Sequence, residues 1–432
     1  MQQSIWSDTV KLPAYDKLKE DISTDVLIIG GGLCGILCAY FLKKAGVDCV
    51  VVEGNKIASG ITKNTTAKIT FQHGLIYSDL IEKKGLNYTQ LYLSAHQSAL
   101  TEYEKLCKNI ECDFTKQSSY IYSVNNRTKI ENEINALDKI GFKAFFEDDI
   151  ELPIKIAGAI RFENQAQFNP LKFISEITKN LNIYENTFVK EIISGKAITS
   201  DATIKADSII VATHFPFINK HGNYFIKLYQ ERSYVSAFKN LPALKGMYLD
   251  ESKNGFSFRS YNDTLLIGAG NHRTGKNSLA WKPINEFAKM YYPKATLAYQ
   301  WATQDCMSLD NIAYIGRYSK NTENLYVATG FNKWGMTSSM LSAMILTDMI
   351  IGAENEFTNI FSPQRSILHP QLAVNVFESA CNLTIPTKKR CPHLGCSLKW
   401  NKNEHTWDCP CHGSRFENSG KLIDNPATND LK

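Results

Sequence analysis

The sequence predicts an α/β protein with an antiparallel substrate-type domain inserted into it and a small metal-binding module near the C-terminus. Three observations predict this class. An apolar run, a glycine triplet and an apolar helical pattern follow one another in residues 25–54, alternating strands occupy 227–267, and cysteines and histidines gather in 391–412. With 432 residues, 44% of them hydrophobic, the chain can build two or three domains.

Residues 25–54 have the spacing of a Rossmann-like βαβ unit, the FAD/NAD(P)-binding arrangement. Gly30 permits the tight turn after the first strand, and Gly32 lets the backbone approach a pyrophosphate. Gly35 lets the helix pack closely on the strand. Glu53 ends the second strand, where its carboxylate can accept hydrogen bonds from ribose hydroxyls. The pyrophosphate is expected at the positive end of the helix.

Residues 25–54 allow two other interpretations, a glycine-rich turn and a membrane helix. A glycine-rich turn of an ordinary α/β protein would lack the flanking strands and the terminal acid. Residues 26–42 also form an uncharged run of 17, but three glycines and a length at the bottom of the spanning range argue against a membrane helix. A buried strand and helix are therefore predicted.

Small and hydroxylated residues dominate 58–74, which can wrap a phosphate and reach the reactive ring of a cofactor, or can be a polar surface loop. Residues 86–110 repeat apolar side chains at helical spacing, with His96 off the stripe and expected in solvent. Asn169 and Pro170 open a helix, and apolar strands at 202–215 and 310–330 return the chain to the first domain.

These sequence patterns predict a discontinuous dinucleotide-binding domain and three further parts of the chain. The expected ranges are 22–75, 150–215 and 305–352 for the first domain, 76–149 and 216–304 for an inserted α+β substrate domain, 353–385 for a connector with a little helix, and 386–432 for an all-β metal module.

Composition limits the partners. The net charge is +5 and there is no basic block, so nucleic acid is not expected as a partner. No signal-peptide pattern and no membrane span are visible, and a cytoplasmic location follows as the default expectation.

Residues 391–412 contain C-x-H, a gap of fifteen residues, and C-P-C-H. Two cysteines and two histidines on paired loops can hold tetrahedral zinc or a [2Fe–2S] cluster with one iron bound by histidines. Simple zinc sites repeat C-x2-C, whereas each loop here supplies one Cys and one His. An extra cysteine on each loop, Cys396 and Cys411, is placed to bridge the loops.

The complete pattern CPHLGC…CPCHGS resembles the Rieske iron–sulfur family. The resemblance implies that Cys391 and Cys409 hold the inner iron and that His393 and His412 hold the outer one. It also implies a Cys396–Cys411 disulfide, a hydrogen bond from Ser414 to cluster sulfur, and a covering loop at 424–427. Phe416 replaces a common tyrosine, so a potential in the lower part of the roughly −150 to +300 mV Rieske range is expected. The edge formed by the two histidines is expected to be exposed and to dock the electron acceptor.

The first 350 residues resemble the D-amino-acid oxidase, glycine oxidase and sarcosine oxidase superfamily of FAD enzymes. DVLIIGGGLCGILCAYFL with Glu53, ADSIIVAT and VATGFNKWGMT carry the resemblance, and TTAKITFQHG with the C-terminal module is similar to a bacterial subgroup with fused [2Fe–2S] domains. It implies FAD bound by Gly30, Gly32, Gly35, Glu53, Thr62, Thr65, Thr66, Ala67, Val189, Gly330, Gly335, Met336 and Thr337.

The combined resemblance implies a dehydrogenase that oxidises a C–N bond of an amine or amino acid by hydride transfer to flavin N5. Electrons would leave singly through the cluster to an external acceptor protein. Lys68 and His73 are the candidate catalytic residues, and Arg232, Arg259 and Arg273 are candidate clamps for a substrate carboxylate. Two alternatives stay open: an electron-transfer or redox-sensing protein without a small-molecule substrate, and an amine oxidase with a zinc-bound structural cap.

Overall fold

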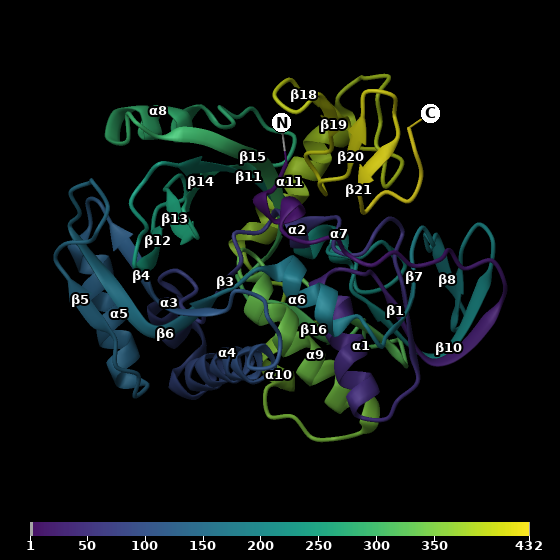
Figure 1. Ribbon diagram of the computed structural model, residues 1–432. Helices are drawn as coiled ribbons and strands as arrows, with labels where there is room; N and C mark the ends of the chain where they lie inside the picture. Colours follow the sequence, from purple (N-terminus) through teal and green to yellow (C-terminus); the bar gives the residue numbers. More distant parts are fainter. Residues whose placement is uncertain (1–2, 432) are drawn as a thin grey trace.

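The computed structural model describes residues 3–431, which form three β-sheets with helices packed on them (Figure 1). The first sheet has eight strands, in the order β16-β17-β10-β1-β2-β7, with β9 beside β10 and β8 beside β9. Within this sheet β16 is antiparallel to β17. The neighbouring strands β17, β10, β1, β2 and β7 all run parallel. Their bounds are β1 Ile22–Ile29, β2 Cys49–Val52, β7 Asn182–Tyr184, β8 Glu191–Ile193, β9 Lys196–Ile198, β10 Thr203–Val211, β16 Tyr314–Arg317 and β17 Leu325–Thr329.

The parallel strands are apolar because helices cover the sheet. Val26 to Ile29 of β1 and all four residues of β2 are buried. Two helices that are apolar on most of their surface, α1 (Leu33–Lys44) and α9 (Gly335–Ile351), pack against each other. Gly352, at φ 74°, ends α9 in the left-handed conformation that glycine adopts without strain. This sheet and its helices are the nucleotide-type domain expected from the sequence.

The second sheet has nine strands, in the order β15-β11-β14-β13-β12-β4-β6-β3, with β5 beside β6. All neighbours are antiparallel except β12 and β4, which are parallel. Their bounds are β3 Lys68–Ile69, β4 Thr115–Ser123, β5 Phe145–Glu147, β6 Gly158–Gln167, β11 Leu228–Lys239, β12 Gly246–Asp250, β13 Ser257–Tyr261, β14 Thr264–Arg273 and β15 Thr296–Ser308.

The remaining elements are short helices, two longer helices and a four-stranded antiparallel sheet, which lies at the top right of Figure 1. The helices are η1 Ile5–Asp8, α2 Ile61–Asn64, α3 Ile76–Lys84, α4 Leu86–Cys107, α5 Arg127–Lys139, α6 Pro170–Ile177, α7 Tyr224–Lys227, α8 Lys282–Tyr291, α10 Thr358–Phe361 and α11 Pro370–Thr384. The small sheet consists of β18 Lys399–Asn401, β19 Thr406–Asp408, β20 Arg415–Glu417 and β21 Leu422–Asp424.

Several local expectations are confirmed and others are corrected. Asn169 caps α6 by accepting from the N–H groups of Leu171 and Lys172, with Pro170 at the first helical position. His96 is not in solvent: it is 1% exposed, because α4 packs against α3, α9 and α10 and is therefore covered on more than one side. The connector holds a full helix, α11, rather than a little helix.

The strand β6 lies in the second sheet, although the sequence ranges assigned 158–167 to the nucleotide-type domain. Its residues at both ends are buried, as in a parallel strand, yet it pairs antiparallel with β4 from Thr115 to Ser123. Burial alone therefore did not indicate which sheet the strand would join. β3 also joins the second sheet, and β15 runs continuously across the expected boundary at 305.

Candidate functional site

A cavity of about 680 Å³ lies between the first two sheets and the C-terminal module. The turn that contains Gly30, Gly32 and Gly35, called the glycine turn below, forms the part of the cavity wall at the ends of β1 and β2. Gly30 has φ 115°, and a Cβ on Gly35 would lie 1.9 Å from the carbonyl oxygen of Gly30. No other residue type fits either position, so the turn leaves backbone and the start of α1 open to the cavity.

Glu53 lies at the edge of the same turn. Its carboxylate accepts hydrogen bonds from the Gly31 N–H at 2.7 Å and from the Asn55 N–H at 2.8 Å. Burial raises the pKa of Glu53, against the effect of these backbone donors. The carboxylate is thereby fixed in place and lines the cavity.

Most residues that the sequence predicts as cofactor contacts line this cavity: Gly30, Gly32, Glu53, Thr62, Thr65, Thr66, Val189, Gly335 and Met336. Four lie behind its wall. Gly35 supports the turn, and Gly330 has Leu228, Ser308 and Tyr314 around it. The Ala67 carbonyl accepts from Arg259, and the Thr337 hydroxyl donates to the Thr70 carbonyl.

Lys68 is the candidate catalytic residue that reaches the cavity. Its ammonium donates to the Tyr248 carbonyl at 2.9 Å and to the Ser257 hydroxyl at 2.6 Å, which leaves one of its three protons free. Burial, with a smaller effect from the Arg259 guanidinium, lowers the pKa of Lys68 to about 7. The group can therefore change charge near neutral pH.

His73 does not line the cavity. Its ring stacks on Trp334 with centroids 4.7 Å apart, and Nδ1 lies 2.7 Å from the Tyr92 hydroxyl. Burial lowers the pKa of His73 to about 3, so the ring is neutral. Trp334 lines the cavity, and His73 supports it from behind.

The second site is the pair of loops in the C-terminal module. The Nδ1 atoms of His393 and His412 lie 3.3 Å apart, and Cys391 and Cys409 are both buried beside them. Cys396 and Cys411 lie in the same group of potential metal ligands as Cys409 and His412, but they form a disulfide and are not available to a metal. The Ala427 N–H donates to the Ser414 hydroxyl at 3.0 Å, which places the 424–427 loop over this site.

The expectation of an exposed histidine edge is wrong for His412 and holds only in part for His393. His412 is 2% exposed, and the rings of Phe215 and Phe225 lie 6.1 and 6.4 Å from its ring. His393 is half-buried, and its Nε2 bonds to the Asn219 side-chain oxygen at 2.8 Å. The larger part of the chain therefore covers the His412 side of the edge, and docking of an external acceptor at this edge stays a prediction.

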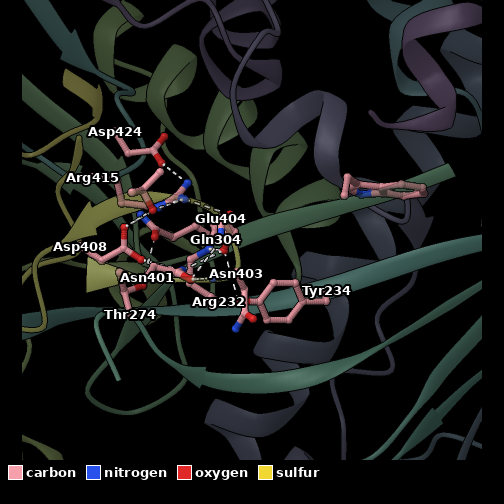
Figure 2. Close-up of polar contacts among 12 residues, drawn as sticks. Arg232, Tyr234, Thr274, Gln304, Asn401, Asn403, Glu404, Asp408, Arg415 and Asp424 are labelled. Carbon is pink, nitrogen blue, oxygen red and sulfur yellow. Dashed lines mark hydrogen bonds and ion pairs between the residues drawn. The ribbon is translucent and has the colours of Figure 1, made fainter. Parts of the chain in front are cut away.

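Buried ion pairs hold the module in this position (Figure 2). Glu404 of the module lies between Arg232 of β11 and Arg415 of β20, and all three side chains are less than 10% exposed. Arg415 also bonds to Asp408 and Asp424. Although burial opposes the charged form, the two arginines lower the pKa of Glu404.

The three arginines expected as substrate clamps have other partners. Arg232 pairs with Glu404, and Arg273 donates to the carbonyls of Pro410 and Cys411 at 2.9 and 3.1 Å. Arg259 donates to the carbonyls of Thr66 and Ala67 at 2.6 and 2.9 Å. Two of them fix the C-terminal module and one supports the loop beside the cavity, so that prediction is corrected.

Further contacts join the two sites, and no local sequence signal marked them. Gln230 donates to the His412 carbonyl at 2.9 Å and Gln304 to the Gly413 carbonyl at 3.0 Å. Asn425 donates to the carbonyls of Thr213 and Phe215 at 2.6 and 2.7 Å. Residues 421–425 and 427–430 of the module line the cavity, and so does His214. One segment, 213–215, thus separates the cavity from the histidine edge.

Comparison with known proteins agrees with both sites. Residues 25–349 match the model of the FAD dependent oxidoreductase family, and residues 365–432 match that of the Rieske [2Fe-2S] domain. A Bacillus subtilis protein named putative Rieske 2Fe-2S iron-sulfur protein YhfW is 34% identical to this chain. The similarity covers all of this chain and 97% of that protein.

Two solved structures share the fold of the larger part. Glycine oxidase from Geobacillus kaustophilus has a TM-score of 0.67 at 18% identity, with 80% of this chain and 99% of that chain covered. L-proline dehydrogenase from P. horikoshii has a TM-score of 0.68 at 16% identity, with 81% and 98% covered.

The donor set of the paired loops and the glycine cradle fit the two groups that these families carry. No helix among residues 3–431 is long and apolar enough to cross a membrane. The chain belongs to the FAD-dependent oxidoreductase family of the D-amino-acid oxidase type and carries a C-terminal Rieske [2Fe–2S] domain.

Proposed function

We propose that the protein is a dehydrogenase that oxidises the C–N bond of an amino acid or amine and delivers the electrons to an external one-electron acceptor protein. When bound, FAD supplies a two-electron acceptor for the substrate and the [2Fe–2S] cluster supplies one-electron transfer. A C–H and an N–H bond break, a C=N bond forms, and two electrons and two protons leave the substrate.

The residues that would hold the two groups follow from the geometry above. The glycine turn, Glu53 and the loop from Thr62 to Thr66 would hold the ADP half and approach the ring of FAD. Cys391 and Cys409 would hold one iron, and His393 and His412 the other. The zinc-bound cap is not retained, because the module matches the Rieske [2Fe-2S] domain over 365–432.

The observation that carries the proposal is the shared wall between the two sites. His214 lines the cavity, and the ring of the next residue, Phe215, lies 6.4 and 6.1 Å from the rings of His393 and His412. An oxidase that passes electrons directly to oxygen needs no such contact. The arrangement favours a relay within one chain.

The test is an anaerobic absorbance titration of the holoprotein with a panel of amines and amino acids. We expect one class of compound to bleach the flavin and then the cluster bands. Bleaching by dithionite alone would favour the electron-transfer or sensing protein instead. Lys68, Ser257 and Asn271 line the part of the cavity formed with the second sheet, and the enzyme is favoured because these polar side chains can contact a small polar substrate.

We further infer that Lys68 binds the carboxylate of an amino-acid substrate. It has a free N–H donor, whereas Lys333, which also lines the cavity, is paired with Asp305 at 3.0 Å and with Glu231 at 3.5 Å. Ser119, Leu249, Ser257 and Gly268 of the second sheet form the wall around it. A charged donor to a buried carboxylate contributes about 1.5–3 kcal/mol.

The pH dependence tests this role. The ammonium form is present below the pKa of about 7, so kcat/KM for an amino acid, divided by that for the matching amine without a carboxylate, should fall as pH rises through that value. Lys68→Met should remove the preference, a loss of about tenfold to a hundredfold at pH 6. Lys68→Arg should extend it to higher pH. A kcat/KM that rises with pH to the same extent for both substrates would instead make Lys68 a base.

A further inference from the structure

An apolar surface on α11 has no partner among residues 3–431. It consists of exposed side chains on the helix and on the adjoining loops: Leu368 (85% exposed), Val374 (47%), Val376 (49%), Phe377 (67%), Leu383 (45%) and Leu394 (39%). We name this set the α11 patch. The helix has a single charged residue, Glu378, which pairs with Lys276 at 2.8 Å. Contiguous exposed apolar surface of this kind marks an interaction site.

The α11 patch is continuous with the loop that carries a predicted iron ligand. Leu394 directly follows His393. The Arg390 guanidinium donates to the carbonyls of Leu383 at 3.2 Å and Gly395 at 2.8 Å, and the Ser397 N–H donates to the Asn382 carbonyl at 2.9 Å. These bonds join the end of α11 and the ligand loop into one surface, and Figure 1 shows α11 beside the small sheet.

Electrons that reach the module need a face through which to leave. The face at His412 is closed by the flavin domain, since His412 is 2% exposed. On the α11 side, Pro392 and Leu394 of the ligand loop are exposed. A protein seated on the α11 patch would therefore lie against the ligand loop itself.

Positive charges border the α11 patch. Lys388 and Arg390 are exposed between α11 and the ligand loop, and exposed Lys220 follows Asn219, the partner of His393. In a symmetric contact between two copies the positive borders of both would enter one interface, and α11 supplies only Glu378, already paired with Lys276, to neutralise them. The helix itself has no Lys or Arg, which helices that lie on membranes use to bind lipid headgroups.

We propose that the α11 patch docks an acidic one-electron carrier protein, the external acceptor of the relay. This rests on the proposed function. Apolar contact would supply affinity and the positive border would steer an acidic partner. Each docking event removes one electron, so two carriers are reduced for each substrate molecule oxidised, and the two protons of the substrate go to solvent.

The test uses the holoenzyme and an acidic plastocyanin as the probe, a one-electron blue-copper carrier to which electron transfer from the cluster is downhill. The holoenzyme is reduced photochemically, so that the result does not depend on the substrate, and the second-order rate of plastocyanin reduction is measured. Phe377→Glu should lower this rate by about tenfold. Lys388→Glu should lower it several-fold at low salt and less at high salt. Reduction of ferricyanide, a small acceptor, should be unchanged in both.

Met290→Glu is the matched control, because Met290 is a 72% exposed apolar residue of α8 outside the patch. An unchanged plastocyanin rate in Phe377→Glu overturns the proposal, as does a wild type that reduces ferricyanide but not plastocyanin. A dimer that Phe377→Glu dissociates, or binding to lipid vesicles that it abolishes, with an unchanged plastocyanin rate, assigns the patch to a second copy or to a membrane. Failure of amines to bleach the flavin would contradict the proposed function without affecting this assay.

Discussion

Replacing Glu404 by leucine is expected to loosen the Rieske domain from the rest of the protein. Glu404 is the only acidic partner of Arg232 within the described residues, and its loss leaves two buried guanidinium groups facing each other. Removing one partner of a buried ion pair costs about 3–5 kcal/mol. We expect the urea midpoint, followed by cluster absorbance, to fall accordingly.

Two further variants identify the cause. In Arg232→Met with Glu404→Leu, Arg415 keeps Asp408 and Asp424, so the double variant should be more stable than Glu404→Leu alone. Glu417→Leu, at an exposed position of β20, should change stability by less than about 0.5 kcal/mol. Equal stability of Glu404→Leu and the wild type would show that the ion pairs do not hold the domain.

The same carboxylate gives a pH dependence. Arg232 and Arg415 lower the pKa of Glu404 in the folded protein. The contribution of Glu404 to the free energy of unfolding is therefore complete above the pKa of an unfolded glutamate, about 4.3, and is lost as pH falls through the lower pKa of the folded protein. Acid should therefore weaken the wild type more than Glu404→Leu. The measurement is the urea midpoint of both proteins between neutral pH and pH 3.

Replacing Gly35 by alanine is expected to abolish FAD binding. The new Cβ would lie 1.9 Å from the Gly30 carbonyl oxygen, and Gly30 cannot retreat, because a shift brings it against the Ala212 backbone and breaks its N–H bond to the Val52 carbonyl at 2.8 Å. Overpacking at such sites costs about 1–3 kcal/mol or more, and a backbone clash belongs at the upper end.

The measurement is the flavin that remains with the protein after gel filtration, together with thermal unfolding. Lys44→Ala, at an exposed position of the same helix, is the control and should retain full flavin. A Gly35→Ala protein with stoichiometric flavin would show that the turn can rearrange, and would remove the glycine turn from the cofactor site.

The sequence predicted features that depend on neighbouring residues and missed those that depend on docking. The glycine turn, the paired Cys and His loops and the cap at Asn169 are local, so their spacing was sufficient. The partners of Arg232 and Arg273 lie 172 and 102 to 138 residues away and are set by where the C-terminal part of the chain packs. The resemblance to the Rieske family implied an exposed edge at His393 and His412, and it could not indicate that another part of this chain covers His412.

His96 shows a related limit. A single apolar stripe on a helix predicts one buried face, but α4 contacts three other helices, so a residue outside the stripe is also covered. The sheet to which β6 belongs could not be predicted for a similar reason, because the sequence of a buried strand does not indicate which strands pair with it.

The wall that residues 421–425 and 427–430 contribute to the flavin cavity implies an order of assembly. Ribosomes complete the glycine turn and its helix long before they release this segment, so nascent protein presents an open cradle. Once the final sheet has folded and Asn425 has bonded to Thr213 and Phe215, that segment narrows the approach to the cavity. Flavin should therefore load faster before the C-terminal domain packs than after it, and cells short of riboflavin should accumulate protein that is slow to recover its flavin.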